Sequence, residues 1–232
     1  MKKIILFVMA LLAYVGNANA QSYKIGDLYD ANGLKGVVVD VDATGTHGLI
    51  MSLEACGKKW SKGGDLKTET ECFDKEDGAN NMATLEKYVK ATGTSWENFP
   101  LFEWARSLGD GWYIPADKEL EKIALAINGG TLDYSEKTIN KFSKIITKAK
   151  GDRLINKGLG HSDDFKKMFS STETGNGMVN QLYFKEKTGS AIGTAILGKL
   201  AKRKGQLEIA QTVKNVGNIG IKEIGSRAVH KF

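Results

Sequence analysis

Four basic side chains gather at the end of one amphipathic stretch, where they could bind acidic groups. Lys199, Lys202, Arg203 and Lys204 close a predicted helix over 191–204. The apolar residues that share one face of this helix are Ile192, Ala195, Ile196 and Leu200. Such a stretch can grip an acidic or sulfated glycan or lie on an anionic membrane surface. The alternative is that the apolar face packs on the domain and the helix dipole favours the basic end.

Catalysis by a nucleophile would require an imidazole partner, and the histidines are His47, His161 and His230. His161 precedes Asp163 and Asp164, but no second His or Cys stands at ligand spacing, which favours a solvated loop over a metal site. The sequence contains no GxSxG, no HExxH and no phosphate-cradling glycine loop. We therefore expect a protein that is not an enzyme and that needs no cofactor or metal.

The first twenty residues have the three parts of a secretion signal in the right order. Two lysines open the segment, an apolar stretch covers 4–15, and small residues at 18–20 precede Gln21. The apolar stretch is shorter than the roughly twenty residues that a membrane-spanning helix needs. We expect a cleaved signal peptide over 1–20, with an uncleaved anchor as the alternative, and export to the periplasm, the cell surface or the medium.

The charge of the chain is mixed rather than polycationic. The 232 residues include 33 basic and 27 acidic ones, a net charge of +6. Loss of the two signal lysines leaves 31 basic against 27 acidic residues, or +4. So small an excess in an exported protein argues against a nucleic-acid partner. With 41% apolar residues and two prolines, the composition is typical of a folded protein.

Cys56 and Cys72 are the two cysteines of the chain, and export would bring them into an oxidising environment. The intervening segment contains three glycines, so closure is sterically easy and a bridge would contribute about 3 kcal/mol. The two cysteines are not in a CxxC motif and no histidine lies near them in the sequence, so metal binding and redox chemistry are not indicated. The sequence predicts a structural disulfide, with two reduced and unpaired thiols as the alternative.

Strands at both ends and helices between them are predicted to position these residues. Short β-branched runs separated by turn residues indicate three strands within 23–53. Apolar residues at helical spacing predict four helices, over 80–89, 99–108, 118–127 and 135–150. Asp117 is the expected N-cap of the third helix. Further strands are predicted over 178–184 and 226–232, which gives an α+β domain whose terminal strands pair.

Three short motifs occur in an order that carries a family resemblance. They are Gly111-Trp112-Tyr113-Ile114-Pro115 with Glu119-Leu120, then Ser170-Ser171-Thr172-Glu173, then Arg227-Ala228-Val229. This series resembles the C-type lectin-like domains of the Lcl C-terminal type, in an exported bacterial form. The resemblance implies a C-type lectin-like fold in which the N- and C-terminal strands pair, helices flank them and long loops form a ligand surface.

The resemblance also implies roles for single residues. Trp112, Pro115, Leu120 and Arg227 would be scaffold residues, with the Arg227 side chain satisfying buried carbonyl groups. The calcium-and-sugar motifs of true C-type lectins, such as Glu-Pro-Asn, do not occur in the matching place. Calcium-dependent sugar binding is therefore not expected.

The chain departs from the family pattern at two places. Phe169 replaces a usual tryptophan, and the segment 185–224 replaces a short hairpin connection. Because no repeat or proline-rich linker divides the chain, we expect one domain over 21–232 that carries this insertion.

These features together favour an exported, non-enzymatic binding protein. It would recognise an acidic or sulfated glycan, or a protein partner, through its loop surface and the insertion 185–224. The alternative hypothesis is a membrane-active or toxin-like secreted factor that acts through the cationic amphipathic insertion.

Overall fold

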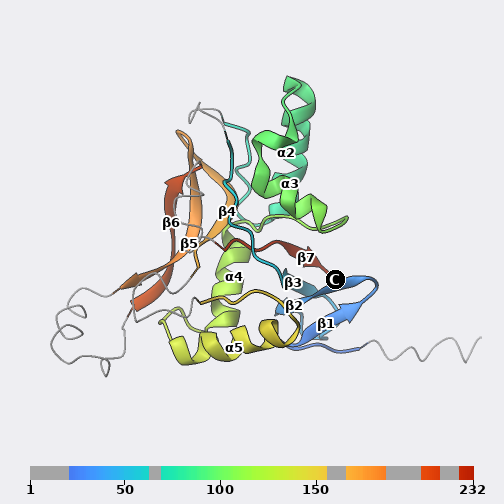
Figure 1. Ribbon diagram of the computed structural model, residues 1–232, viewed down its shortest axis with the longest axis vertical. Coiled ribbons are helices and arrows are strands. Elements are labelled where there is room, and N and C mark those ends of the chain that lie inside the picture. Colours follow the sequence, from blue (N-terminus) through green and yellow to red (C-terminus); the bar gives the residue numbers. More distant parts are fainter. Residues whose placement is uncertain (1–20, 63–68, 156–165, 187–204, 215–224) are drawn as a thin grey trace, which may run out of the picture.

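The computed structural model describes residues 21–62, 69–155, 166–186, 205–214 and 225–232. Within these ranges the protein has four α-helices and two antiparallel sheets (Figure 1). The predicted α+β class is confirmed. None of the helices in these ranges is both long enough and apolar enough to cross a membrane.

The first sheet joins the two ends of the described chain. Its strands, in spatial order, are β1 (Leu28–Ala31), β2 (Leu34–Val41), β3 (Gly48–Ser52) and β7 (Val229–Lys231). β1 and β2 form a tight hairpin because Asn32 and Gly33 both adopt positive φ, at 54° and 77°. β7 pairs with β3, with Ile50 opposite His230. The predicted meander and the pairing of the terminal strand with the N-terminal region are both present.

The second sheet consists of β4 (Met168–Gly175), β5 (Met178–Glu186) and β6 (Gly205–Val213), in that order. β5 and β6 pair without a register shift, with Leu182 opposite Ile209. β6 lies inside the segment 185–224 that the sequence treats as an insertion. Part of that segment is therefore a regular strand of the domain rather than an appendage.

The four helices begin and end close to their predicted bounds. They are α2 (Gly78–Thr92), α3 (Pro100–Ser107), α4 (Asp117–Ile127) and α5 (Glu136–Lys148), and a short 3-10 helix, η1 (Trp96–Asn98), precedes α3. Asp77 caps α2 by accepting from the Ala79 N–H at 2.9 Å, and Ser135 caps α5 by accepting from the Thr138 N–H at 3.3 Å.

The prediction of Asp117 as an N-cap is wrong by one residue. Ala116 is the N-cap of α4, and Asp117 is its first helical residue. The Asp117 carboxylate accepts instead from Asn180 Nδ2 of β5 at 2.7 Å. Glu119 takes over the capping role, because its carboxylate accepts from the Ala116 N–H at 2.8 Å.

Both faces of the first sheet are covered. Alternation along β2 sends Val37 and Val39 into a cluster with α4 and α5, and Val38 into a second cluster with α2 and α3. α4 packs against β2 and also against the strands of the second sheet, so it lies between the two sheets (Figure 1). This arrangement brings the N-terminal ends of α2 and α4 beside the first sheet.

Arg227 is a buried structural residue, as the resemblance implies. Its side chain is 1% exposed, and its guanidinium donates to the carbonyl oxygens of Ser52 at 3.0 Å, Leu53, and Asp152 at 2.6 Å. Burial lowers the pKa of Arg227 to about 10, so the side chain remains charged at neutral pH. The other scaffold residues implied by the resemblance, Trp112, Pro115 and Leu120, are also buried.

The expected disulfide between Cys56 and Cys72 is not formed in the structure, where both are buried free thiols. Each sulfur has its own partner. Cys56 Sγ accepts from the Lys58 N–H at 3.4 Å, and Cys72 Sγ donates to the Asn81 carbonyl oxygen at 3.3 Å. Burial raises the pKa of the Cys72 thiol to about 12, which keeps it protonated.

Candidate functional site

Several residues singled out in the sequence fall outside the described part of the chain. These are the basic residues Lys199, Lys202, Arg203 and Lys204, together with His161 and the signal segment 1–20. Two histidines are described. His47 is exposed on the loop before β3, and His230 on β7 has its Nε2 3.2 Å from the Asp110 carbonyl oxygen. Among the described residues, no three His, Cys, Asp or Glu side chains are grouped to hold a metal ion.

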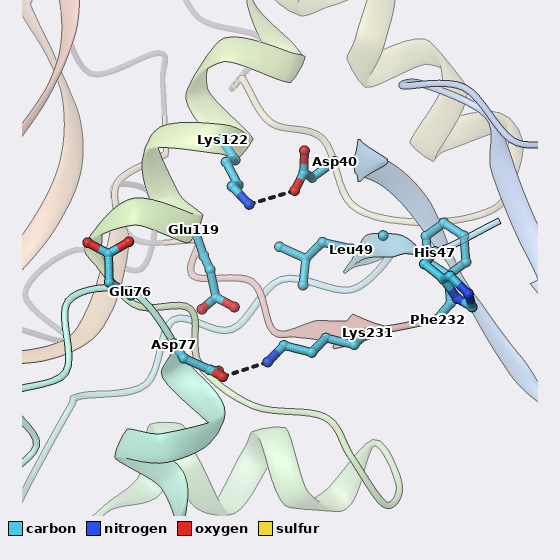
Figure 2. A pocket seen from close by; sticks show the side chains of 10 residues that line it. Asp40, His47, Leu49, Glu76, Asp77, Glu119, Lys122, Lys231 and Phe232 are labelled. Atoms are coloured by element: carbon cyan, nitrogen blue, oxygen red, sulfur yellow. Dashed lines mark hydrogen bonds and ion pairs between the residues drawn. The ribbon is translucent and has the colours of Figure 1, made fainter. Parts of the chain in front are cut away.

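A cleft of about 380 Å³ lies where the first sheet meets the N-terminal ends of α2 and α4 (Figure 2). Its lining residues are Asp40, His47, Gly48, Leu49, Glu76, Asp77, Glu119, Lys122, Lys231 and Phe232. Two ion pairs cross it. Lys122 Nζ lies 2.6 Å from the Asp40 carboxylate, and Lys231 Nζ lies 2.6 Å from the Asp77 carboxylate.

The local fold places each of these four charges. Asp40 follows a register shift in β2, and Lys122 projects from α4, so the first pair joins helix to sheet. Asp77 caps α2 and Lys231 lies on β7, so the second pair joins another helix to the terminal strand. Because all four side chains are partly exposed, each pair is worth at most about 1 kcal/mol.

Glu119 is the buried member of the cleft, with 5% of its surface exposed. Its carboxylate accepts from the Tyr113 hydroxyl at 2.7 Å, the Ala116 N–H at 2.8 Å and the Gly78 N–H at 2.9 Å. Burial raises the pKa of Glu119 even though these three hydrogen bonds favour the charged form. With both oxygens engaged by the protein itself, Glu119 joins the starts of two helices.

The charge balance of the cleft is acidic. Four carboxyl side chains, Asp40, Glu76, Asp77 and Glu119, face two lysines, and both lysines are already paired. A polyanion would therefore meet excess negative charge and lysines that are partly neutralised. The cleft does not have the electrostatics that an acidic glycan requires.

A second polar surface lies on α5, and we call it the lysine stripe. It consists of Lys137, Lys141, Lys144 and Lys148, all exposed and spaced four, three and four residues apart. This spacing places them on one side of the helix over about 16 Å. Ile139, Phe142 and Ile146 on the opposite side are buried, and the only acid of α5 is Glu136.

The lysine stripe is a functional candidate that the sequence reasoning missed. The apolar residues of α5 indicate its buried face, but the basic residues between them repeat with the same period. That repetition was available in the sequence. It becomes a surface feature once the structure shows that α5 buries one face and exposes the other.

Comparison with known proteins leaves the chain without an assigned family. No protein-family model and no curated protein matches it. Among solved structures, a fimbrial protein from Bacteroides ovatus is similar at a TM-score of 0.47 and 16% sequence identity. The similarity covers 90% of this chain and 48% of that protein, so the chain spans about half the length of this neighbour. A likeness of this degree assigns neither a fold family nor a function.

Proposed function

We propose that this chain is an exported, non-enzymatic binding protein that recognises an acidic glycan polymer along the lysine stripe of α5. The observation that carries the proposal is the arrangement of Lys137, Lys141, Lys144 and Lys148 on one exposed helix face. With Glu136 as the only acid of the helix, the local charge is +3. That local excess approaches the net charge of +4 expected for the whole chain without its signal.

The packing of α5 supports binding by a preformed surface. Phe142 and Ile146 anchor the helix in the core, and Ser135 caps its first turn, so the backbone beneath the lysines is fixed. Lysine side chains are flexible, strongly hydrated point charges, which suits repeated anionic groups better than one shaped ligand. Binding of this kind is weak for each contact, gains from multivalency and decreases as salt rises.

The proposal can be tested with one fourfold variant and one matched control. The stripe variant is K137Q/K141Q/K144Q/K148Q. The control, K35Q/K90Q/K118Q/K122Q, removes the same charge from lysines that lie in ion pairs elsewhere on the surface. On an immobilised sulfated polysaccharide, we expect the stripe variant to bind roughly tenfold or more weakly than the wild type at low salt. The control should keep most of the wild-type affinity.

An equal loss of affinity in the stripe variant and the control would mean that binding depends on net charge alone, which would contradict the proposal. Failure of the wild type to bind any sulfated or carboxylated polysaccharide at low salt would also contradict it. A third variant, with Lys199, Lys202, Arg203 and Lys204 changed to glutamine, tests the basic cluster predicted from the sequence. A neutral glucan serves as the ligand control, because it offers no charge to the stripe.

The fold family and the export of the chain belong to the same proposal. A C-type lectin-like fold is supported by β7 returning to pair with β3 and by the bridge between Tyr113 and Val229. The buried Arg227 and the motif order support it as well. An experimental structure compared with lectin-like domains tests the fold. N-terminal sequencing of the secreted protein tests export, with Gln21 as the expected first residue.

A further inference from the structure

Lys214 and Glu173 form a buried ion pair, apart from both surfaces described above. Glu173 lies on β4, and Lys214 directly follows β6. Their side chains are 0% and 3% exposed respectively, and Lys214 Nζ contacts Glu173 Oε1. Buried lysine and glutamate are rare in proteins because removal of two charges from water is costly.

The surroundings hold this pair in one arrangement. The Thr70 N–H donates to Glu173 Oε2 at 2.9 Å, and the Thr70 hydroxyl donates to Oε1 at 3.0 Å. Lys214 Nζ lies 4.8 Å from the centre of the Trp60 ring, which is itself fully buried. The backbone of Lys214 is fixed by hydrogen bonds to Ser61 and Gly177, at 3.3 and 3.2 Å.

These contacts present a nitrogen to a carboxyl group with little water nearby. Because the amine and the carboxyl group are already held together, much of the entropy cost of a reaction between two separate molecules is removed. The Thr70 N–H is shared between the two carboxylate oxygens, 2.9 Å from Oε2, which would remain as the carbonyl, and 3.1 Å from Oε1, so it would stabilise negative charge that develops during attack. Cys72 stays a neutral thiol beside the pair and adds no competing charge.

We propose that Lys214 and Glu173 condense to an intramolecular isopeptide bond. Lys214 Nζ first passes one proton to Glu173 Oε1, which gives the nitrogen a lone pair; Nζ then attacks Glu173 Cδ, the new C–N bond forms, and the bond from Cδ to Oε1 breaks. Two protons of the ammonium group leave with Oε1 as one water molecule, and the third stays on the amide nitrogen. No electrons are transferred and no co-reactant is needed. The amide replaces two buried charges with a neutral group, which removes their desolvation cost.

Tryptic mass spectrometry of the purified folded protein tests the bond directly. Cleavage after Lys214 should fail, because its ammonium group is consumed. The expected product joins residues 168–185 to residues 205–222 and is lighter than the sum of the two peptides by one water molecule. Fragmentation should place the link between Glu173 and Lys214.

The protein contains a matched control pair in the same sheet. Lys185 Nζ lies 3.1 Å from the Glu208 carboxylate, but both side chains are substantially exposed. This pair should remain unlinked, with normal cleavage after Lys185. The variant Lys214→Arg keeps the positive charge but should give only linear peptides.

Complete recovery of the linear peptides 168–185 and 205–214 from folded wild-type protein, after prolonged incubation, would overturn the proposal. The pair would then be an ordinary buried ion pair. If Lys214→Arg does not fold, the wild-type peptide map decides the question alone. A cross-link that maps to Lys185 and Glu208 would equally contradict the role of burial.

Discussion

At the scale of single residues, Glu119 shows how a carboxyl group can belong to a cleft and still serve the fold. Its three hydrogen bonds come from three backbone or side-chain donors, Gly78, Ala116 and Tyr113. Burial nevertheless dominates, so the pKa of Glu119 lies above its ordinary value of 4.5. The native protein therefore holds this proton more tightly than the unfolded chain does.

The raised pKa of Glu119 predicts a specific dependence of stability on pH. Well below pH 4.5 the Glu119 carboxyl group is protonated in the native and unfolded states, and its stabilising contribution to the fold is then at its maximum. As the pH rises above 4.5, the unfolded state releases its proton first, so the wild type loses stability until the native pKa is passed. Glu119→Gln removes this loss, because the amide keeps an acceptor for the two N–H groups and can donate to Tyr113.

Urea denaturation at a series of pH values measures the effect. The free energy of unfolding of Glu119→Gln, minus that of the wild type, should increase as the pH rises above 4.5 and level off once the native pKa of Glu119 is passed. Other carboxyl groups titrate equally in both proteins and cancel in this difference. A difference that stays constant over the whole range would show that burial of Glu119 does not favour its protonated form.

Arg227 and the two cysteines differ in how far their contacts could be predicted from the sequence. The role of Arg227 was accessible, because a motif resemblance implied a buried arginine that satisfies carbonyl groups. The partners Ser52 and Asp152 were not, because they are distant in the sequence. A disulfide between Cys56 and Cys72 was predicted because the chain has two cysteines and export was expected. Neither reason contains information on the hydrogen-bond partners that the two sulfur atoms have in the fold.

At the scale of elements, α2 and the segment before α4 lie in close contact. A Cβ atom added to Gly78 would lie 2.2 Å from the Ile114 carbonyl oxygen and 2.9 Å from the Ala116 nitrogen. Both are backbone atoms that cannot rotate away. Gly78 is thus required at the start of α2 for close approach.

We predict that Gly78→Ala destabilises the protein by about 2 kcal/mol, because the added methyl group overpacks this contact. Thermal and urea denaturation measure the loss. Ala83→Ser, on the exposed side of the same helix, is the control and should change stability by less than about 0.5 kcal/mol. An unchanged stability for Gly78→Ala would mean that the start of α2 can move away from residues 114–116.

Elements with strong local patterns were predictable, and elements defined by distant contacts were less so. Helices α2 to α5 follow from the spacing of their apolar residues. The first residue of α4 was misplaced because Asp117 binds Asn180 of β5. β6 was missed, although Leu207 and Ile209 alternate as a strand requires, because its segment was interpreted as an insertion.

At the scale of the whole molecule, β7 completes the first sheet and contacts the segment before α4. Val229 is fully buried, pairs with Met51 of β3 and forms a bridge with Tyr113. Lys231 adds the ion pair with Asp77 at the cleft. The short strand thus holds together parts of the protein that are remote in sequence (Figure 1).

Removal of residues 229–232 is predicted to abolish cooperative unfolding, because it exposes β3 and uncovers both core clusters. Near-UV circular dichroism and the width of the thermal transition measure this loss. Lys231→Gln is the control, since it removes only a partly exposed ion pair and should cost less than about 1 kcal/mol. A truncated protein that melts as sharply as the full chain would disprove this role for β7.

The pairing of β3 with β7 also bears on the timing of folding. β3 ends at Ser52 and β7 begins at Val229, so the contact closes a very long stretch of chain. Long-range pairing of this kind slows folding, because the entropy cost of closing the loop comes before the stabilising contacts can form. During synthesis the first sheet stays incomplete until residue 231 has left the ribosome. If the chain is exported as proposed above, this late completion of the sheet would keep it unfolded until it has crossed the membrane.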